Sequence, residues 1–469
     1  MTDPVRAYAH AHEPQLIADL KSLVSYPSVG ADPDMAQGME DARQFIEARI
    51  KAMGFTNARR LTPPDGSGQA ALYAERMDAP GKPTILVYAH YDVQPADPLE
   101  KWHTPPFEAV EKDGKIFGRG ISDDKAPMLI ALDTLAAFVA VEGRLPINVK
   151  LLIEGEEETG SPSLPAILKN HRGLLAADAV LSADGARWRP DLVALNVGSR
   201  GNTGFEIRVQ TASQDLHSGR YGGIVANPLH VMSGLLAGLH DSQGRIAAAS
   251  FYDGVAGPTA QERSEIAAIP YNEAEAFGGL EAQPWGEAGY STLERLWLRP
   301  TLDVNGMWGG YTGAGSKTVI PNEAFAKLTM RLVPGQEPAH AKKAVIDHLQ
   351  AHLPSFATLE VYGERGEGGA YAVPPDHPLL AAAMIALEKT TGQTPLKVRI
   401  GASLPLTEIV HRILGIDTVM FSFAIADENF HVPNEFFRLS SVTDGLSAWI
   451  EVIRQIAALD QENWPINSM

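Results

Sequence analysis

Two kinds of apolar segment alternate along most of this sequence, and the alternation constrains the fold more than any other feature. Residues 16–24 and 42–53 carry apolar side chains at helical spacing, whereas residues 84–89 form a short apolar run rich in β-formers. Residues 126–141 are apolar and too long for a strand, which predicts a buried helix. Such alternation is typical of a largely parallel sheet with helices on both faces.

The same pattern continues along the chain and resumes near the C-terminus. Further elements are expected as strands at 149–153, 179–182 and 418–423 and as helices at 379–391 and 442–458. Between Gly198 and about Pro375 the pattern of apolar and polar residues differs. Strands with one exposed face are expected there at 205–209 and 326–332, and helices at 228–239 and 339–352.

An insertion interrupts the second region. Residues 250–312 are rich in Gly, Pro, Trp and Tyr and show weak periodicity, which predicts an irregular segment. We therefore expect an α/β protein with a split domain, residues 1–198 and 375–469, built on a mixed, mainly parallel sheet flanked by helices. Residues 199–374 are expected to form an inserted α+β domain.

Composition excludes several classes of function. The chain has no cysteine, which rules out disulfides, thiolate metal sites, iron–sulfur clusters and a cysteine nucleophile. Its 57 acids and 39 bases give a net charge of −18, which argues against nucleic acid or an anionic membrane as the main partner. Neither a secretory signal nor an apolar run long enough to span a membrane is evident, so a cytoplasmic location is expected.

Two candidate segments contain acids beside a histidine or a glycine-rich turn. His90 and Asp92 directly follow the strand expected at 84–89, where ligands bind in α/β sheets. Asp123 and Asp124 lie in the segment Gly-Arg-Gly-Ile-Ser-Asp-Asp-Lys. Each has a structural alternative, since His90 also fits a hydrogen-bonded strand-end histidine and the aspartates fit a helix N-cap.

Three further segments follow other expected strands. Glu156, Glu157 and Glu158 are consecutive and would repel one another without a cation, although a solvated acidic loop is the alternative. Asp184 follows the strand at 179–182, where a turn or cap residue is also common. His431 follows the strand at 418–423 and taken alone also fits an ordinary loop histidine.

Together these segments supply imidazole and carboxylate groups, the ligand set expected for zinc, manganese or cobalt in a site without thiols. A glutamate next to a metal ligand could also activate water as a general base.

In order along the chain, these segments resemble the co-catalytic metallopeptidase family that includes carnosinases, broad dipeptidases, glutamate carboxypeptidase, acetylornithine deacetylase and succinyl-diaminopimelate desuccinylase. The resemblance implies a split catalytic domain with two divalent metal ions. Zinc is expected, with manganese or cobalt as alternatives. It further implies that Asp123 bridges both ions, that His90 and Asp184 complete one, and that Glu158 and His431 complete the other.

The family pattern also implies roles for acids beside the ligands. Glu157 is similar to the general base that deprotonates the shared water and later protonates the leaving amine. Asp92 is similar to the acid that orients the metal site. Asp124 occupies a position at which the family often has a cis peptide bond.

In the inserted domain the resemblance implies a lid that also forms a homodimer. His217 lies in a segment similar to the lid motif whose histidine polarises the scissile carbonyl, usually in a partner subunit's site. Thr318 and Arg331 lie in similar lid segments, and such an arginine holds the substrate's C-terminal carboxylate. Ser403 lies in a segment similar to a catalytic-domain loop that contacts the same carboxylate.

The length of the inserted domain favours the dipeptidase and carnosinase branch. We therefore expect hydrolysis of dipeptides with a free C-terminal carboxylate, with a small peptide as the only partner besides a second subunit. An N-acyl-amino-acid deacylase or desuccinylase is the alternative. A non-catalytic binding protein on the same fold is a third reading.

Overall fold

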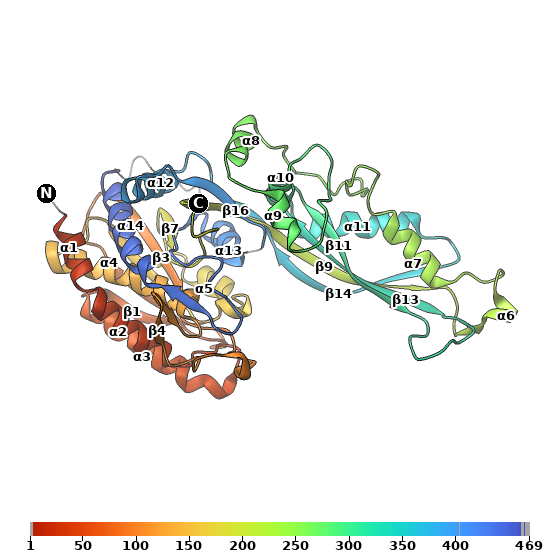
Figure 1. Cartoon of the computed structure of the whole chain (residues 1–469), viewed down its shortest axis with the longest axis horizontal. Helices are drawn as coiled ribbons and strands as arrows, with labels where there is room; N and C mark the ends of the chain where they lie inside the picture. The colour runs from red at the N-terminus through yellow and green to blue at the C-terminus, as the bar shows by residue number, and fades with distance from the viewer. Residues whose placement is uncertain (1–2, 403, 461–463, 465–469) are drawn as a thin grey trace. The chain divides into compact units, whose positions relative to one another are not determined.

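The computed structural model describes residues 3–402, 404–460 and 464 (Figure 1). Contacts divide the chain into two compact units: unit 1 comprises Met1–Val197, Val373–Val398 and Ile409–Met469, and unit 2 comprises Gly198–Ala372 and Arg399–Glu408. The boundaries expected from sequence differ from this division at Arg399–Glu408. This segment groups with unit 2 because the backbone N–H and the Nε of Arg200 donate to the carbonyls of Ala402 and Gly401.

Unit 1 contains a mixed six-stranded sheet in the order β1–β2–β6–β3–β7–β17. Its strands are β1 (Thr56–Leu61), β2 (Ala71–Arg76), β3 (Thr84–His90), β6 (Asn148–Glu154), β7 (Ala179–Ser182) and β17 (Thr418–Met420). The four strands β6, β3, β7 and β17 run parallel, and β1 and β2 continue the sheet antiparallel. The carboxyl ends of the parallel strands therefore lie at one edge of the sheet.

Helices flank this sheet, which confirms the predicted α/β class (Figure 1). They are α1 (Pro4–Ala11), α2 (Glu13–Val24), α3 (Ala36–Ala52), α4 (Ala126–Glu142), α5 (Leu164–Asn170), α12 (Pro378–Thr391), α13 (Pro405–Leu414) and α14 (Leu439–Ala457). Helix α4 packs against β3 and α14 and is buried over most of its surface, as its uninterrupted apolar sequence predicts. The strand expected at 418–423 ends earlier, at Met420, although Phe421 and Phe423 stay buried.

Unit 2 is built on an antiparallel sheet in the order β11–β13–β9–β14. Its strands are β9 (Gly201–Gln210), β11 (Thr301–Gly309), β13 (Glu323–Leu332) and β14 (Thr358–Gly368). Alternate residues of β13 are buried, and they pack with α7 (Pro228–Ala237) and α11 (Pro338–His352) in one apolar core. The alternation read from the sequence thus places one face of the sheet in the core and leaves the other for polar side chains.

The expectation that 250–312 is irregular is wrong in part. This segment forms α8 (Ala260–Ala267), α9 (Glu273–Gly278), α10 (Thr292–Leu298) and strand β11. Strand β11 lies at the sheet edge and its register shifts between Val304 and Gly306. Apolar and polar residues therefore do not alternate regularly along it.

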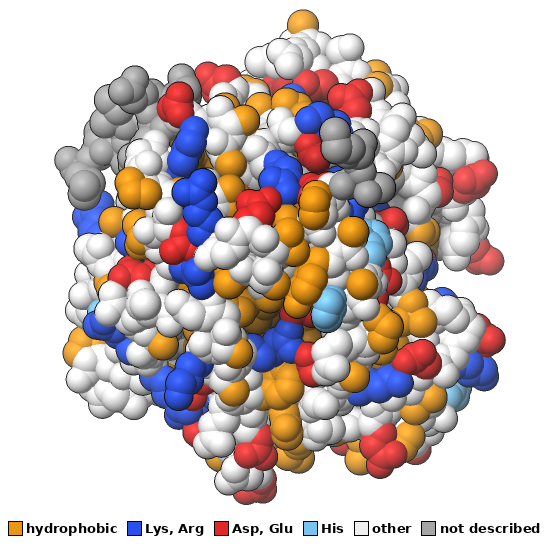
Figure 2. All heavy atoms as spheres, turned by 90° about the vertical axis from the view of Figure 1, so that its left-hand side faces the viewer, with side chains coloured by type: hydrophobic (Ala, Val, Ile, Leu, Met, Phe, Trp, Pro, Cys, Tyr) orange, Lys and Arg blue, Asp and Glu red, His pale blue; other side chains and the backbone are white. Residues whose placement is uncertain are grey.

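Shorter elements complete the chain. They are β4 (Val110–Lys112), β5 (Lys115–Phe117), β8 (Ala194–Ser199), β10 (Leu216–His217), α6 (Ser218–Tyr221), β12 (Val319–Ile320), β15 (Tyr371–Ala372), β16 (Leu396–Ile400) and β18 (Phe436–Arg438). None of the helices in the described part of the chain is long and apolar enough to cross a membrane. On the face drawn in Figure 2, Lys and Arg side chains lie interspersed with Asp and Glu side chains.

Candidate metal centre

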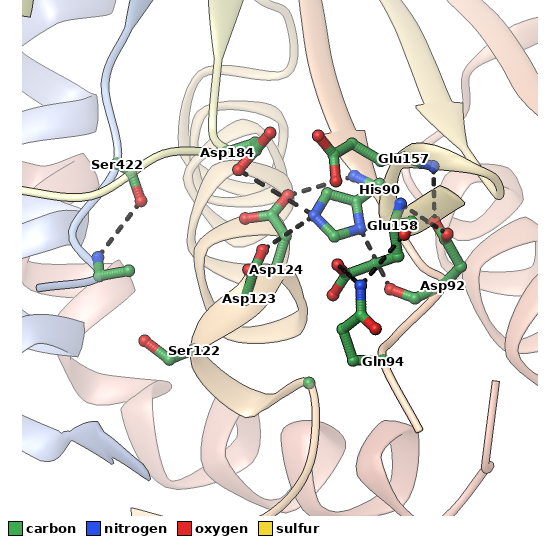
Figure 3. Close-up of polar contacts among 12 residues, drawn as sticks. His90, Asp92, Gln94, Ser122, Asp123, Asp124, Glu157, Glu158, Asp184 and Ser422 are labelled. Atoms are coloured by element: carbon green, nitrogen blue, oxygen red, sulfur yellow. Dashed lines mark hydrogen bonds and ion pairs between the residues drawn. The ribbon is translucent and has the colours of Figure 1, made fainter. Parts of the chain in front are cut away.

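The candidate site lies in unit 1, where the parallel strands end. His90 is the last residue of β3, Glu157 and Glu158 lie just beyond β6, and Asp184 lies just beyond β7. The segment after β17 carries His431. Figure 3 shows the carboxylates of Asp123, Glu157 and Asp184 gathered around the His90 ring. Neighbouring parallel strands thus assemble segments that are far apart in the sequence.

The first group of ligating side chains consists of His90, Asp123 and Asp184. One ligand atom from each lies within 4.8 Å of the others, as required for a shared cation. The His90 Nε2 is 3.0 Å from Oδ1 of Asp123 and 4.0 Å from Oδ1 of Asp184. The His90 side chain is fully buried and its Nδ1 lies 3.1 Å from the Asp92 carbonyl oxygen. That contact fits an Nδ1–H donor, which leaves Nε2 directed at the two carboxylates.

The second group consists of Asp123, Glu158 and His431, whose ligand atoms also lie within 4.8 Å of one another. The His431 Nε2 is 3.1 Å from Oδ2 of Asp123 and 3.1 Å from Oε2 of Glu158. Asp123 therefore presents one carboxylate oxygen to each histidine. A carboxylate shared in this way is suited to bridge two cations.

The backbone before Asp123 is shaped by a glycine that no other residue could replace easily. Gly120 has a φ of +73°, and a Cβ built on it would lie 2.0 Å from the Val93 side chain. The chain then turns through Ile121–Lys125 into α4, and the Asp123–Asp124 peptide bond is cis, as the family pattern led us to expect. This turn directs Asp123 towards the strand ends.

Two side chains hold the glutamate segment in place. The Asp92 carboxylate accepts hydrogen bonds from the backbone N–H groups of Glu157 and Glu158, at 3.2 and 3.0 Å. Gln94 donates to the Glu158 carboxylate at 2.8 Å. Asp92 is completely buried, and its role is to hold this segment in position.

The acids of the site carry strongly shifted pKa values. Burial raises the pKa of Glu157 well above its usual range, and the nearby Asp184 carboxylate raises it further. Burial also raises the pKa of Asp184 to about 6. Both shifts arise because negative charge is crowded where little water can solvate it. A cation between these groups would relieve the crowding.

The histidines shift in the opposite sense. Burial alone would lower the pKa of His90, but its contacts with Asp123 and Asp92 raise that pKa well above the usual value. The Asp123 and Glu158 carboxylates raise the pKa of His431 to about 10. The carboxylates that surround each ring thus favour positive charge at both histidines. The imidazole and carboxylate donors of this cluster fit divalent metal ions of the zinc type.

The sequence did not identify the residue that organises the Asp123 turn. Glu435 is buried, and its carboxylate accepts hydrogen bonds from the backbone N–H groups of Gly120, Ser122 and Asp123, at 2.8, 2.9 and 3.2 Å. Its other partner is Arg119, at 2.8 Å, which is equally buried. Glu435 thus joins the segment that carries His431 to the segment that carries Asp123.

Glu428 connects the same two segments at a second point. Its buried carboxylate accepts hydrogen bonds from the Ser122 hydroxyl and from the backbone N–H of Ile425, and it also pairs with Arg438. The only feature of the sequence that pointed to Glu428 and Glu435 is that both are acids close to His431. The sequence gave no indication that their partners are backbone groups of a distant turn.

The candidate residues in unit 2 fall into two places. His217 pairs with Val319 across β10 and β12, and the N–H of Ser218 donates to the carbonyl of Thr318, so His217 and Thr318 are neighbours. The His217 side chain is solvent-accessible, and its Nδ1 accepts a hydrogen bond from the N–H of Gly219 at 3.0 Å. The structure thus brings together these two residues of the expected lid site.

Arg331 lies elsewhere in unit 2, near the end of β13. The start of β13 at Glu323 lies on the side of His217 and Thr318, and the usual rise of a strand separates Glu323 from Arg331 by roughly 27 Å. Figure 1 shows α6, which begins beside His217, at one end of this sheet and α10 at the other. Ser403, the third candidate substrate-binding residue beside Thr318 and Arg331, lies outside the described residues.

Fold and site together define a class of hydrolase in which clustered carboxylates and imidazoles at the carboxyl edge of an α/β sheet can hold metal ions. A family model described as Peptidase family M20/M25/M40 matches residues 86–455, and the chain belongs to this family.

Curated relatives and solved structures agree with this assignment. Beta-Ala-His dipeptidase of Homo sapiens is 29% identical over 98% of this chain and 93% of its own length. Cys-Gly metallodipeptidase DUG1 of Saccharomyces cerevisiae is 29% identical over 92% of this chain and 94% of its own. The crystal structure of the M20 family metallo-carboxypeptidase Sso-CP2 from Sulfolobus solfataricus is 28% identical, covers 95% of this chain and 99% of its own, and superposes with a TM-score of 0.77.

Proposed function

We propose that this protein is a metal-dependent dipeptidase that hydrolyses dipeptides with a free C-terminal carboxylate. The observation that carries the proposal is the pair of ligand groups that share Asp123, with the Glu157 carboxylate beside them and outside both groups. Relatives named as Beta-Ala-His and Cys-Gly dipeptidases, matched over more than nine-tenths of this chain, support dipeptides as the substrate class.

We assign the first metal position to His90, Asp123 and Asp184 and the second to Asp123, Glu158 and His431. Zinc is the expected ion because both positions combine imidazole with carboxylate, and manganese or cobalt could replace it. Two such ions would polarise the scissile carbonyl and lower the pKa of a shared water.

Glu157 is the general base in this proposal. Its carboxylate takes the proton of the attacking water and then passes it to the nitrogen of the leaving amine. The high pKa that burial and Asp184 give Glu157 in the cation-free cluster would fall once positive charge is present, so the carboxylate becomes available to accept a proton. The Asp92 carboxylate positions Glu157 by accepting a hydrogen bond from the backbone N–H of Glu157.

Substrate recognition is assigned to residues of unit 2. Arg331 would hold the C-terminal carboxylate through two parallel hydrogen bonds, assisted by Ser403. His217 and Thr318 would bind the scissile carbonyl region. An extended dipeptide spans only about 7 Å, much less than the length of sheet that separates Arg331 from His217 and Thr318.

This separation supports a homodimer through unit 2, in which one copy supplies Arg331 and the other supplies His217 to each substrate. Size-exclusion chromatography with light scattering tests the dimer. Mixing His217→Ala with Glu157→Gln chains tests the exchange, because each chain alone is impaired and a mixed dimer would regain one complete site. The cytoplasmic location stays a prediction from the sequence.

The reaction is tested by comparing kcat/KM for Ala-Ala with that for N-acetyl-alanine and N-succinyl-alanine on zinc-loaded protein. The proposal predicts that Ala-Ala is cleaved fastest and that a chelator abolishes the reaction. A preference for the acylated substrates would identify a deacylase instead. Failure to bind any metal, together with no hydrolysis, would leave only a binding role for this fold.

A further inference from the structure

A second cluster of charged side chains lies in unit 2, around a cavity of about 410 Å³. Residues of the sheet strands β11 and β13 line it, together with residues of α10 and of the segment around Trp285. The charged side chains that line it are Arg200, Arg295, Arg299, Arg331, Glu287 and Asp303. Four arginines against two acids make this arginine pocket positive within a chain whose net charge is −18.

The sheet register brings two of the arginines together. Arg331, near the end of β13, pairs with Asn202 on β9, and Arg200 directly precedes the first residue of β9, so both arginines come to line the cavity. The two arginines therefore share one cavity, and Arg331 is near enough to act on the charge of Arg200, although they are far apart in the sequence.

Arg200 is the residue in this pocket that most requires a partner. Only 8% of its surface is exposed, and its Nε donates to the Gly401 carbonyl at 2.7 Å. Among the described residues, no side chain accepts a hydrogen bond from its terminal nitrogens. Burial and the neighbouring Arg331 lower the pKa of Arg200 to about 10. A buried guanidinium whose terminal nitrogens meet no acceptor side chain among the described residues, with a like charge beside it, favours an anion.

The remaining arginines differ in how far they are already paired. Arg299 forms two hydrogen bonds with the Glu287 carboxylate, at 2.8 and 3.0 Å, so its charge is compensated. Arg295 donates to the Thr292 hydroxyl at 3.0 Å, a neutral partner. Arg200 and Arg295 therefore supply the positive charge that an incoming ligand would meet.

The pocket gains a role once Arg331 is assigned to the C-terminal carboxylate, a step that rests on the proposed function. The carboxylate and the side chain of the C-terminal residue are attached to the same Cα atom. A substrate held by Arg331 must therefore place its C-terminal side chain within a few ångströms of Arg331, where the arginine pocket begins.

We propose that the arginine pocket selects dipeptides whose C-terminal residue is acidic, with the side-chain carboxylate bound by Arg200 and Arg295. Glutamate fits this arrangement, because its two carboxylates are joined by a short chain and can each meet one of two neighbouring guanidinium groups. Glutamine has the same shape without the charge. It would leave the Arg200 guanidinium without an anionic partner.

The test compares Ala-Glu with Ala-Gln as substrates of the zinc-loaded enzyme. Wild-type protein should show a kcat/KM for Ala-Glu that is about tenfold or more above that for Ala-Gln, the scale of a charge-assisted hydrogen bond. Arg200→Met should bring the ratio close to one, mainly through a higher KM for Ala-Glu. Arg295→Met should lower the ratio less, and it provides a second measurement should Arg200→Met fold poorly.

Arg208→Met is the matched control. Arg208 lies on β9, outside the pocket, and pairs with Glu323 and Glu360. This variant should keep the wild-type ratio. Equal kcat/KM values for Ala-Glu and Ala-Gln in the wild type, or a ratio unchanged in both pocket variants, would overturn the selectivity proposal. Failure of the proposed function would look different, because then neither dipeptide, nor Ala-Ala, would be cleaved.

Discussion

The two units concentrate charge of opposite sign, and they hold it in different ways. In unit 1, acids converge on two histidines, and the backbone around them is fixed by further buried carboxylates, such as that of Asp92. In unit 2, the arginines line a cavity, and the side chain of Arg200 donates to one carbonyl group. The first arrangement is a preorganised site for cations, and the second is a site with donors left for an anion.

This difference shows what holds the side chains of each site in position. The ligands of unit 1 are positioned by hydrogen bonds that do not depend on a bound ion, since Glu435 alone accepts three backbone N–H groups. The arginine pocket depends on its ligand for compensation of charge. Because the candidate metal ligands and the framework bonds both lie in unit 1, we expect removal of cations or loss of these bonds to affect unit 1 strongly and unit 2 little.

Metal removal should have the largest effect. Dialysis against a chelator should abolish hydrolysis, and added zinc should restore it, because every step of the proposed reaction takes place at the cation site. Hydrogen exchange of the chelated protein should increase at the strand ends and turn around Asp123, where uncompensated acids repel, and stay unchanged in β9 and β13. Full activity in the chelated protein would contradict the proposed function.

Glu157→Gln should rank second. Loss of the general base should lower kcat by about 10²–10⁴-fold while both metal ions remain bound, as measured by steady-state kinetics and elemental analysis. Glu156→Gln is the neighbouring control, because the Glu156 carboxylate accepts hydrogen bonds from the N–H groups of Gln69 and Ser163. It should keep most of the activity. Equal loss in both variants would show that the base is elsewhere.

Glu435→Gln tests the framework of unit 1. Both oxygens of the Glu435 carboxylate accept hydrogen bonds from backbone N–H groups. A glutamine amide in either orientation would place its own NH2 group against one of these donors. The buried Arg119 would also lose its counter-charge. Unfolding by denaturant should show a loss of about 3–5 kcal/mol. Zinc affinity should fall about 10–100-fold.

The control is Asp191→Asn, which breaks the exposed pair with Arg189 and should leave both quantities nearly unchanged. A Glu435→Gln variant with wild-type stability and zinc affinity would show that this carboxylate does not position the site.

The smallest of these effects is a pH dependence of metal binding. Without metal, Asp123 and Glu158 raise the pKa of His431 to about 10, so the ring is protonated at neutral pH. A cation requires the neutral imidazole and must displace this proton, so zinc affinity should fall as the pH is lowered from 8 to 6. Calorimetry in buffers of different ionisation enthalpy should detect less proton release for His431→Ala. Identical proton release in the variant would contradict this assignment.

Much of unit 1 could be predicted because its signals are local. Long apolar runs identified α4 and the parallel strands, and the polar residues directly after those strands, such as His90 and Asp184, identified the candidate ligands. Spacing alone did not distinguish a metal ligand from a residue with a purely structural role. Their combination in one order along the chain made the metal-site interpretation specific.

The parts that could not be predicted depend on contacts that leave no local pattern. Glu435 binds backbone N–H groups more than 300 positions away, and backbone groups are the same in every sequence. Strand β11 lacks alternation because it is an irregular edge strand. The arginine pocket depends on the pairing of β13 with β9, which places Arg331 near the start of β9, and Arg200 directly precedes that strand. Such pairing is not evident from composition or periodicity.

The central claim is that Asp123 is shared by two metal positions. A crystal structure of the zinc-loaded protein, with diffraction data collected on both sides of the zinc absorption edge, tests it most directly. We predict two anomalous peaks about 3.5–4 Å apart, on either side of the Asp123 carboxylate. One should contact His90 and Asp184, and the other Glu158 and His431. A single peak, or peaks that do not contact Asp123, would contradict the two-metal site.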